Sequence, residues 1–105
     1  MSSVSYLLTL DRSDHNSARL WVDSSHDGRL DPGEEVPLGT RDGLHWAGRA
    51  DLDPTAGTRF LLLFNAPVGT KWSFVAVEVG TGRDLYSLVN QTTAVAPEQL
   101  VGRLL

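Results

Sequence analysis

Residues 71–79 read KWSFVAVEV, and this stretch is the clearest indicator of the fold. In an extended chain, Trp72, Phe74 and Ala76 lie on one face, and the valines at positions 75, 77 and 79 lie on the other. Aromatic and β-branched residues that alternate with a period of two are typical of a β-strand. We therefore predict a strand over residues 71–79.

The same period of two recurs through most of the chain. Apolar residues alternate with others in residues 3–10, 18–22 and 44–52, and Phe60, Leu62 and Phe64 share one face. Stretches rich in Gly, Pro, Asp, Asn and Ser separate these runs, as turns do between strands. The predicted strands are residues 3–10, 18–22, 35–38, 44–52, 58–64, 71–79 and 85–89. About seven short strands at near-regular spacing predict an all-β protein, and we expect a β-sandwich.

The length of the chain, 105 residues, suffices for one domain with a single core, so we predict that residues 1–105 form one sandwich domain. A domain of this size has little room for an enclosed active-site cavity. Residues 97–104 are the one helix candidate, because Pro97 stands where a first helical turn would begin. If neighbouring strands are antiparallel, the loops at 23–34, 53–57 and 80–84 should lie together at one end.

Composition excludes several classes of function. A net charge of -4 opposes the neutralisation of phosphates on which nucleic-acid binding depends. The absence of Cys excludes disulfides, thiolate nucleophiles and Cys-based zinc sites, and leaves the compartment open. The longest fully apolar run, residues 60–64, is far too short to span a membrane. The first ten residues lack the basic region of a signal peptide, so we expect a cytoplasmic chain or a fragment of an exported protein.

The segment DSSHDGRLDPGE, residues 23–34, carries the most specific chemistry in the chain. Its twelve residues have the ligand spacing of an EF-hand calcium loop, with Gly28 at the sixth position, where the loop turns sharply. Oxygen ligands alone suit a hard cation, and Ca²⁺ before Mg²⁺. The predicted ligands are Asp23, Ser25, Asp27, the carbonyl group of Arg29, Asp31 and Glu34.

The flanks of this loop differ from those of an EF-hand. Residues 18–22 before it are predicted to form a strand, and Pro37 after it would break an exiting helix. We therefore predict an EF-type loop on a β scaffold, with Glu35 as a solvated neighbour outside the ligand set. The alternative is a polar surface turn without metal. Four carboxylates that repel one another in so short a turn favour the metal site.

The stretch LWVDSSHDGRLDPGEE resembles the calcium loop in the B-type domains of serine-aspartate-repeat surface proteins of Gram-positive bacteria. That family has a strand ending in an aromatic residue, followed by D-x-N-x-DG-x-x-D-x-GE, and Ser25 replaces its usual Asn. DGLHWAGRADL and GTRFLLLFNAPVG are similar to the run that follows, so the resemblance covers residues 20–69. It implies a calcium-stabilised β-sandwich of prealbumin-like or immunoglobulin-like type, and it does not carry over an adhesive function.

Other residues suggest weaker alternatives. Trp46 and Trp72 fall on apolar faces and are predicted in the core, whereas Trp21 lies opposite Leu20 and Val22 and could contact a sugar ring. No G-x-S-x-G nucleophile motif occurs, so no enzyme is predicted. Three functions remain open at this point. The first is a non-enzymatic module that binds one Ca²⁺ in loop 23–34, the second a carbohydrate-binding module with structural calcium, and the third a metal-free subunit that pairs through a sheet edge.

Overall fold

The computed structural model describes residues 2–11, 18–23, 29–30, 32–40, 44–52, 58–65, 68–91 and 98–104. In this part of the chain the regular structure is almost entirely β. The elements are β1 (Ser2–Leu10), β2 (Ala18–Val22), a short 3-10 helix η1 (Pro32–Glu34), β3 (Glu35–Val36), β4 (Gly39–Thr40), β5 (His45–Leu52), β6 (Arg59–Phe64), β7 (Lys71–Glu78), β8 (Asp84–Gln91) and β9 (Glu98–Arg103).

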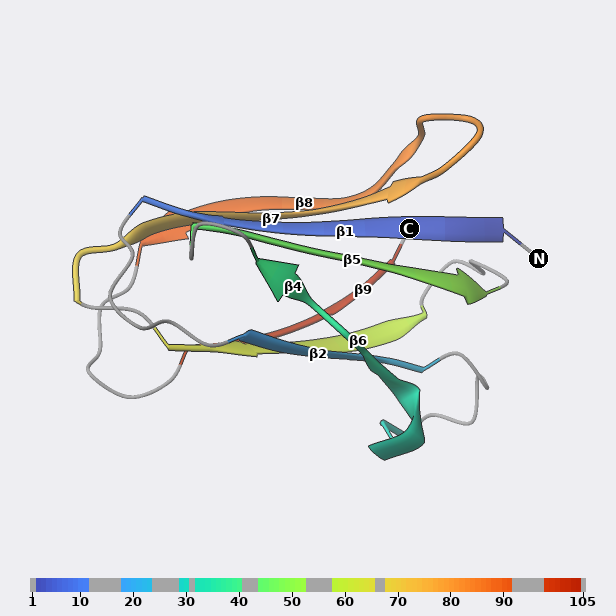
Figure 1. The fold of residues 1–105 in the computed structure, drawn as a ribbon, viewed down its shortest axis with the longest axis horizontal. Helices are drawn as coiled ribbons and strands as arrows, with labels where there is room; N and C mark the ends of the chain where they lie inside the picture. Colours follow the sequence, from blue (N-terminus) through green and yellow to red (C-terminus); the bar gives the residue numbers. More distant parts are fainter. Residues whose placement is uncertain are drawn as a thin grey trace.

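These strands form two antiparallel sheets that pack face to face (Figure 1), which confirms the predicted sandwich. Sheet A has five strands in the order β4-β5-β1-β7-β8, and sheet B has four in the order β3-β2-β6-β9. The strand β1 lies in the middle of sheet A, where it pairs with β5 on one side and β7 on the other. Strands far apart in the sequence therefore meet in both sheets.

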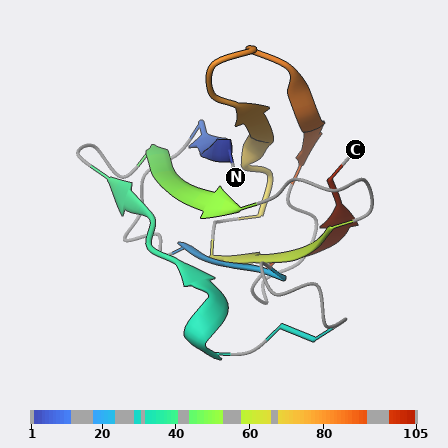
Figure 2. The same cartoon turned by 90° about the vertical axis from the view of Figure 1, so that its right-hand side faces the viewer.

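Only the first half of the strand predicted at 35–38 is a strand, and a second short strand that was not predicted follows it in the other sheet. Glu35–Val36 pairs with β2 in sheet B, whereas Gly39–Thr40 pairs with β5 in sheet A. Between them the chain crosses one side of the sandwich (Figure 2). Pro37 lies at this crossing, where a residue without a backbone N–H donor loses no ladder hydrogen bond. The crossing segment packs tightly on β5, because a Cβ atom at Gly48 would stand 2.6 Å from the carbonyl oxygen of Pro37.

The predicted helix at 97–104 is wrong. Its described residues form β9, which pairs with β6 along the register Leu62↔Leu100 and Phe60↔Gly102. Leu104 is buried, and its backbone N–H donates to the carbonyl of Thr58 at 2.8 Å. The open edge of β6 therefore offers this segment a ladder of hydrogen bonds. A short helix containing Gly102 would have gained less.

The core consists of the inward-facing residues of both sheets. The alternation predicted this set well, since every inward position of β1 from Val4 to Leu10 is buried. Trp72 is buried as predicted, and Trp46 is half-buried against the core. The buried apolar side chains are Val4, Tyr6, Leu8, Leu10, Leu20, Val22, Val36, Phe60, Leu62, Phe64, Trp72, Phe74, Ala76, Leu85 and Leu104.

Aromatic rings join the two sheets. Phe60 of sheet B lies 5.4 Å from Phe74 and 4.8 Å from Tyr86, both in sheet A, measured between ring centroids. On the neighbouring strand, Tyr6 stacks on Phe74 at 6.3 Å. The hydroxyl of Tyr6 is buried without a hydrogen-bond partner among the described residues, as are the Nε1 atoms of Trp46 and Trp72. Burial raises the pKa of the Tyr6 hydroxyl far above its usual value.

The hairpin between β7 and β8 is closed by two glycines in left-handed conformations. Gly80 has φ 103° and Gly82 has φ 71°, a region that other residues enter only with strain. The turn is held by the backbone N–H of Glu78, which donates to the carbonyl of Arg83 at 2.9 Å. A bulge between Ala76 and Val77 shifts the register near this end, so both Leu85 and Tyr86 turn toward the core.

The strand directions confirm the predicted grouping of connections at one end of the sandwich. β2, β5 and β7 all end there, and the described strand ends on either side of the 53–57 connection also lie at this end.

Among the described residues, no helix is long and apolar enough to cross a membrane.

Candidate functional site

The predicted calcium loop begins where β2 ends and finishes at the start of β3. Asp23, Arg29 and Glu34 belong to the described part of the chain, whereas Ser25, Asp27 and Asp31 lie outside the described residues. The geometry below therefore concerns the two ends of the loop and Arg29.

The pairing of β2 with β3 brings the two ends of the loop together. Leu20 is opposite Val36 and Trp21 is opposite Glu35 in the antiparallel register. Asp23 follows Trp21 by two residues, and Glu34 directly precedes Glu35. The pairing therefore holds the first and twelfth positions of the loop just beyond the ends of two paired strands, as is needed if both are to reach one cation.

Asp23 is held firmly at its position. Its backbone N–H donates to the carbonyl of Arg59 at 2.9 Å, which extends the pairing of β2 and β6 by one residue. Only 4% of the residue is exposed. The sheet therefore fixes the backbone of the first predicted ligand at the end of β2.

Glu34 is the last residue of η1 and is half-buried. Pro32 opens this short helix, at a position where its missing N–H donor is not needed. The helix turns the chain directly before β3, so Glu34 stands at the junction between the loop and the sheet. The prediction that strands, and not helices, flank the loop is confirmed at both ends.

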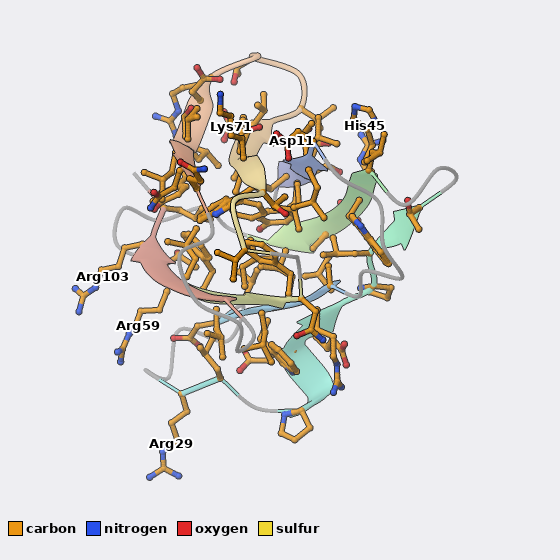
Figure 3. The ribbon with its side chains drawn as sticks, turned by 90° about the vertical axis from the view of Figure 1, so that its left-hand side faces the viewer. Asp11, Arg29, His45, Arg59, Lys71 and Arg103 are labelled. Carbon is orange, nitrogen blue, oxygen red and sulfur yellow. The ribbon has the colours of Figure 1, made fainter. Side chains whose placement is uncertain are left out.

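Arg29 occupies the seventh position, where the ligand would be the backbone carbonyl. Its side chain is exposed and extends away from the sandwich (Figure 3). That placement suits a residue whose side chain takes no part in a cation site. Leu30, the next residue, is half-buried.

Glu35 is engaged elsewhere. Its carboxylate accepts two hydrogen bonds from Arg19, one from Nε and one from an Nη atom, both at 2.9 Å. The hydrogen bonds from Arg19 hold the pKa of Glu35 below its usual value. Two adjacent glutamates thus lie in different elements: Glu34 is the last residue of η1, and Glu35, the first residue of β3, is bound by an arginine. The sequence alone suggested a solvated Glu35 and missed this ion pair.

Trp21, the predicted sugar contact, lies on the outer face of sheet B and is half-buried. The guanidinium carbon of Arg19 sits over its ring, 4.8 Å from the centroid. The arginine is in turn fixed by Glu35. Part of the aromatic surface that a sugar ring would stack on is therefore already covered. The spacing of Arg19 two residues before Trp21 on a strand is the signal that could have identified this contact.

A second surface feature lies at the opposite end of sheet A. A shallow groove there is lined by Thr9, Leu10, Asp11, Lys71, Trp72, Ser73 and Val89. Asp11 and Lys71 lie side by side at this end (Figure 3), and a carboxylate oxygen of Asp11 accepts from the backbone N–H of Lys71 at 2.9 Å. The contact holds the end of β1 against the start of β7, which gives Asp11 and Lys71 a structural role.

The donor chemistry of the loop suits a hard cation. Asp23 and Glu34 carry carboxylates at the two ends of the loop, next to the pairing of β2 with β3. Within the described ranges alone, no group of three or more His, Asp or Glu side chains could hold a metal ion, and half of the six predicted ligands lie outside those ranges.

Comparison with known protein families, curated proteins and solved structures finds no match to this chain.

Proposed function

We propose that this chain is a non-enzymatic, calcium-binding β-sandwich module. One Ca²⁺, bound by the loop at 23–34, would rigidify the end of the sandwich at which β2 ends and β3 begins. The rigid end would serve a structural role or the binding of another protein.

The observation that carries the proposal is the closure of the loop by the pairing of β2 with β3. This pairing joins the strands on either side of the loop before any ion arrives, so part of the entropy of closing the loop is already met by the sheet. A cation would then need to order only the residues between them. The resemblance of the sequence to a bacterial calcium loop supports the same reading.

The affinity we expect is modest. The loop has no paired second loop to pre-organise it, so we expect a dissociation constant of roughly 10⁻⁵–10⁻³ M. At a hundredfold excess of free calcium, binding to the folded state alone would stabilise it by about 2.7 kcal/mol. For a domain of this size the melting temperature should rise by roughly 10–20 °C between chelator and saturating calcium.

The decisive experiment compares two adjacent glutamates by calorimetry. Glu34→Gln should weaken calcium binding at least tenfold, because it removes a charged ligand. Glu35→Gln is the matched control. It removes the same charge at the next residue, from a carboxylate that Arg19 already binds. If the two variants bind calcium equally well, or if the wild-type chain shows no binding heat and no melting shift at millimolar calcium, the proposal is wrong.

A further inference from the structure

Among the residues that the structure describes, the edge of sheet A at β8 is open and unprotected. Sheets commonly protect their edges with short strands, charged residues, Pro or bulges, because an open edge pairs with any strand it meets. β3 and β4 are only two residues long, and β9 ends in Gly102 and the exposed Arg103. β8 has eight residues, and Asp84, its first, is the only charged one.

The unprotected part of β8 is Tyr86–Gln91, with the sequence YSLVNQ. It contains no Pro and no charge, and the bulge in the β7–β8 ladder lies before it, so its backbone is regular. Within the described residues, β8 pairs with β7 and with no other strand. Val89 is 76% exposed, the highest value among the large apolar side chains described as exposed.

We propose that β8 pairs antiparallel with β8 of a second copy of this chain, about a two-fold axis. The two A sheets would then form one continuous sheet. In an antiparallel pair, side chains directly opposite each other lie on the same face of the sheet. The two-fold axis must therefore pass between a residue and its own copy, and not between two successive residues of the strand. Centred on Leu88, it sets each Ser87 opposite the partner's Val89 on the outer face, and Leu88 opposite the partner's Leu88 on the inner face.

The charge of β8 favours this self-pairing. The single carboxylate, Asp84, stands four residues from Leu88, so the two-fold axis places the two copies of it eight residues apart. At about 3.3 Å per residue, they are separated by about 26 Å. A parallel arrangement in register would instead set Asp84 beside its own copy, which like charges oppose. The half-buried Leu88 and the exposed Val89 would both lose exposure in the antiparallel pair.

The test is sedimentation equilibrium of the whole chain over a wide range of concentration, in chelator, so that calcium plays no part. The weight-average mass should rise from 11.4 kDa toward twice that value. Val89→Lys places a charge on the open edge and should weaken dimerisation at least tenfold. Its thermal melt should match the wild type, because residue 89 is 76% exposed.

Leu7→Lys is the matched control. Leu7 lies on the same outer face of sheet A, but on the central strand β1, and is 39% exposed. Edge pairing should survive this change, whereas stacking of two outer faces should not. A wild-type chain that stays monomeric at millimolar concentration, an open-ended polymer, or a dimer that Leu7→Lys disrupts and Val89→Lys does not would each overturn the proposal.

Spin labels give a second readout. The chain has no Cys, so a single cysteine introduced at a chosen position is labelled alone. Labels at position 89 should lie within about 10 Å of each other across the new ladder and broaden each other's spectra. Labels at position 7 should be about 24 Å apart, five strand spacings, and show no such broadening. Broadening at position 7 without broadening at position 89 would refute edge pairing.

Discussion

Removing the hydroxyl of Tyr6 should make the protein more stable. The ring of Tyr6 is fully buried in the core, and its hydroxyl has no hydrogen-bond partner among the described residues. A buried polar group that loses water and gains no partner costs about 1–3 kcal/mol. Tyr6→Phe keeps the ring and its stacking on Phe74 and removes only the costly group.

The expected gain is about 1 kcal/mol in the free energy of unfolding, because some of the penalty is offset by contacts that the oxygen atom makes. For a domain of this size, that corresponds to a rise of roughly 4–8 °C in melting temperature. Denaturant and thermal unfolding measure both quantities. Tyr86→Phe is the control, since the ring of Tyr86 is half-buried and its hydroxyl is not among the buried unpartnered atoms. That variant should change stability much less.

The same substitution predicts a difference at high pH. Burial raises the pKa of Tyr6 in the folded state, so the unfolded chain releases this proton first. The wild-type protein should therefore keep its full stability below pH 10 and lose stability as the pH rises further, by up to about 1.4 kcal/mol per pH unit. Tyr6→Phe should lack this contribution. If Tyr6→Phe is less stable than wild type by 1 kcal/mol or more at neutral pH, the hydroxyl makes a favourable contact and the reasoning fails.

Three further substitutions test close packing and backbone conformation, with Gly39→Ala as their shared control, because a Cβ atom there meets nothing within 4 Å. Gly48→Ala should cost about 1–3 kcal/mol in denaturant unfolding, since its new Cβ would stand 2.6 Å from the Pro37 carbonyl oxygen; a neutral result would mean that the crossing segment moves freely. Gly82→Ala should cost about 1–2 kcal/mol through its φ of 71° alone, and an unchanged melting temperature would show that the hairpin adopts another turn. Gly102→Ala should cost a similar amount because its Cβ would stand 2.7 Å from the Phe60 ring, and it should cost less in a Phe60→Leu background; additive effects in this double-mutant cycle would contradict the contact.

The fold could be predicted where the chain alternates cleanly. The positions predicted to face inward in residues 3–10, 60–64 and 72–76 are buried, because one face of each strand packs on the opposite sheet. The division of residues 35–40 between two sheets could not be predicted, since it depends on which neighbouring edges are available. The same is true of β9, whose local sequence fits a short helix and whose strand exists because β6 offers an open edge.

The candidate site could be predicted in part. The spacing of oxygen donors in residues 23–34 determined the ligand set proposed from sequence, and the structure contributes the strand pairing that joins the two flanks of the loop. The spacing of Arg19 and Trp21 on one strand could have indicated their contact. The ion pair of Arg19 with Glu35 could not be predicted, because these two residues meet only when β2 pairs with β3. Loop spacing separated Glu34 from Glu35 in the sequence, and the strand pairing adds the arginine that binds Glu35.

The central position of β1 has a consequence for how the protein folds during synthesis. β1 leaves the ribosome before β5 and β7, the two strands between which it must lie, and sheet B is complete only when β9 has joined β6. Until β5 and β7 have been synthesised, β1 is an apolar strand with two open edges whose partners lie more than 30 residues further along the chain. Topologies dominated by such distant pairings fold in roughly milliseconds to seconds, much more slowly than helical bundles. The emerging chain is therefore exposed to wrong pairings for longest at its first strand, and a chaperone that shields residues 2–10 would act at the most vulnerable moment.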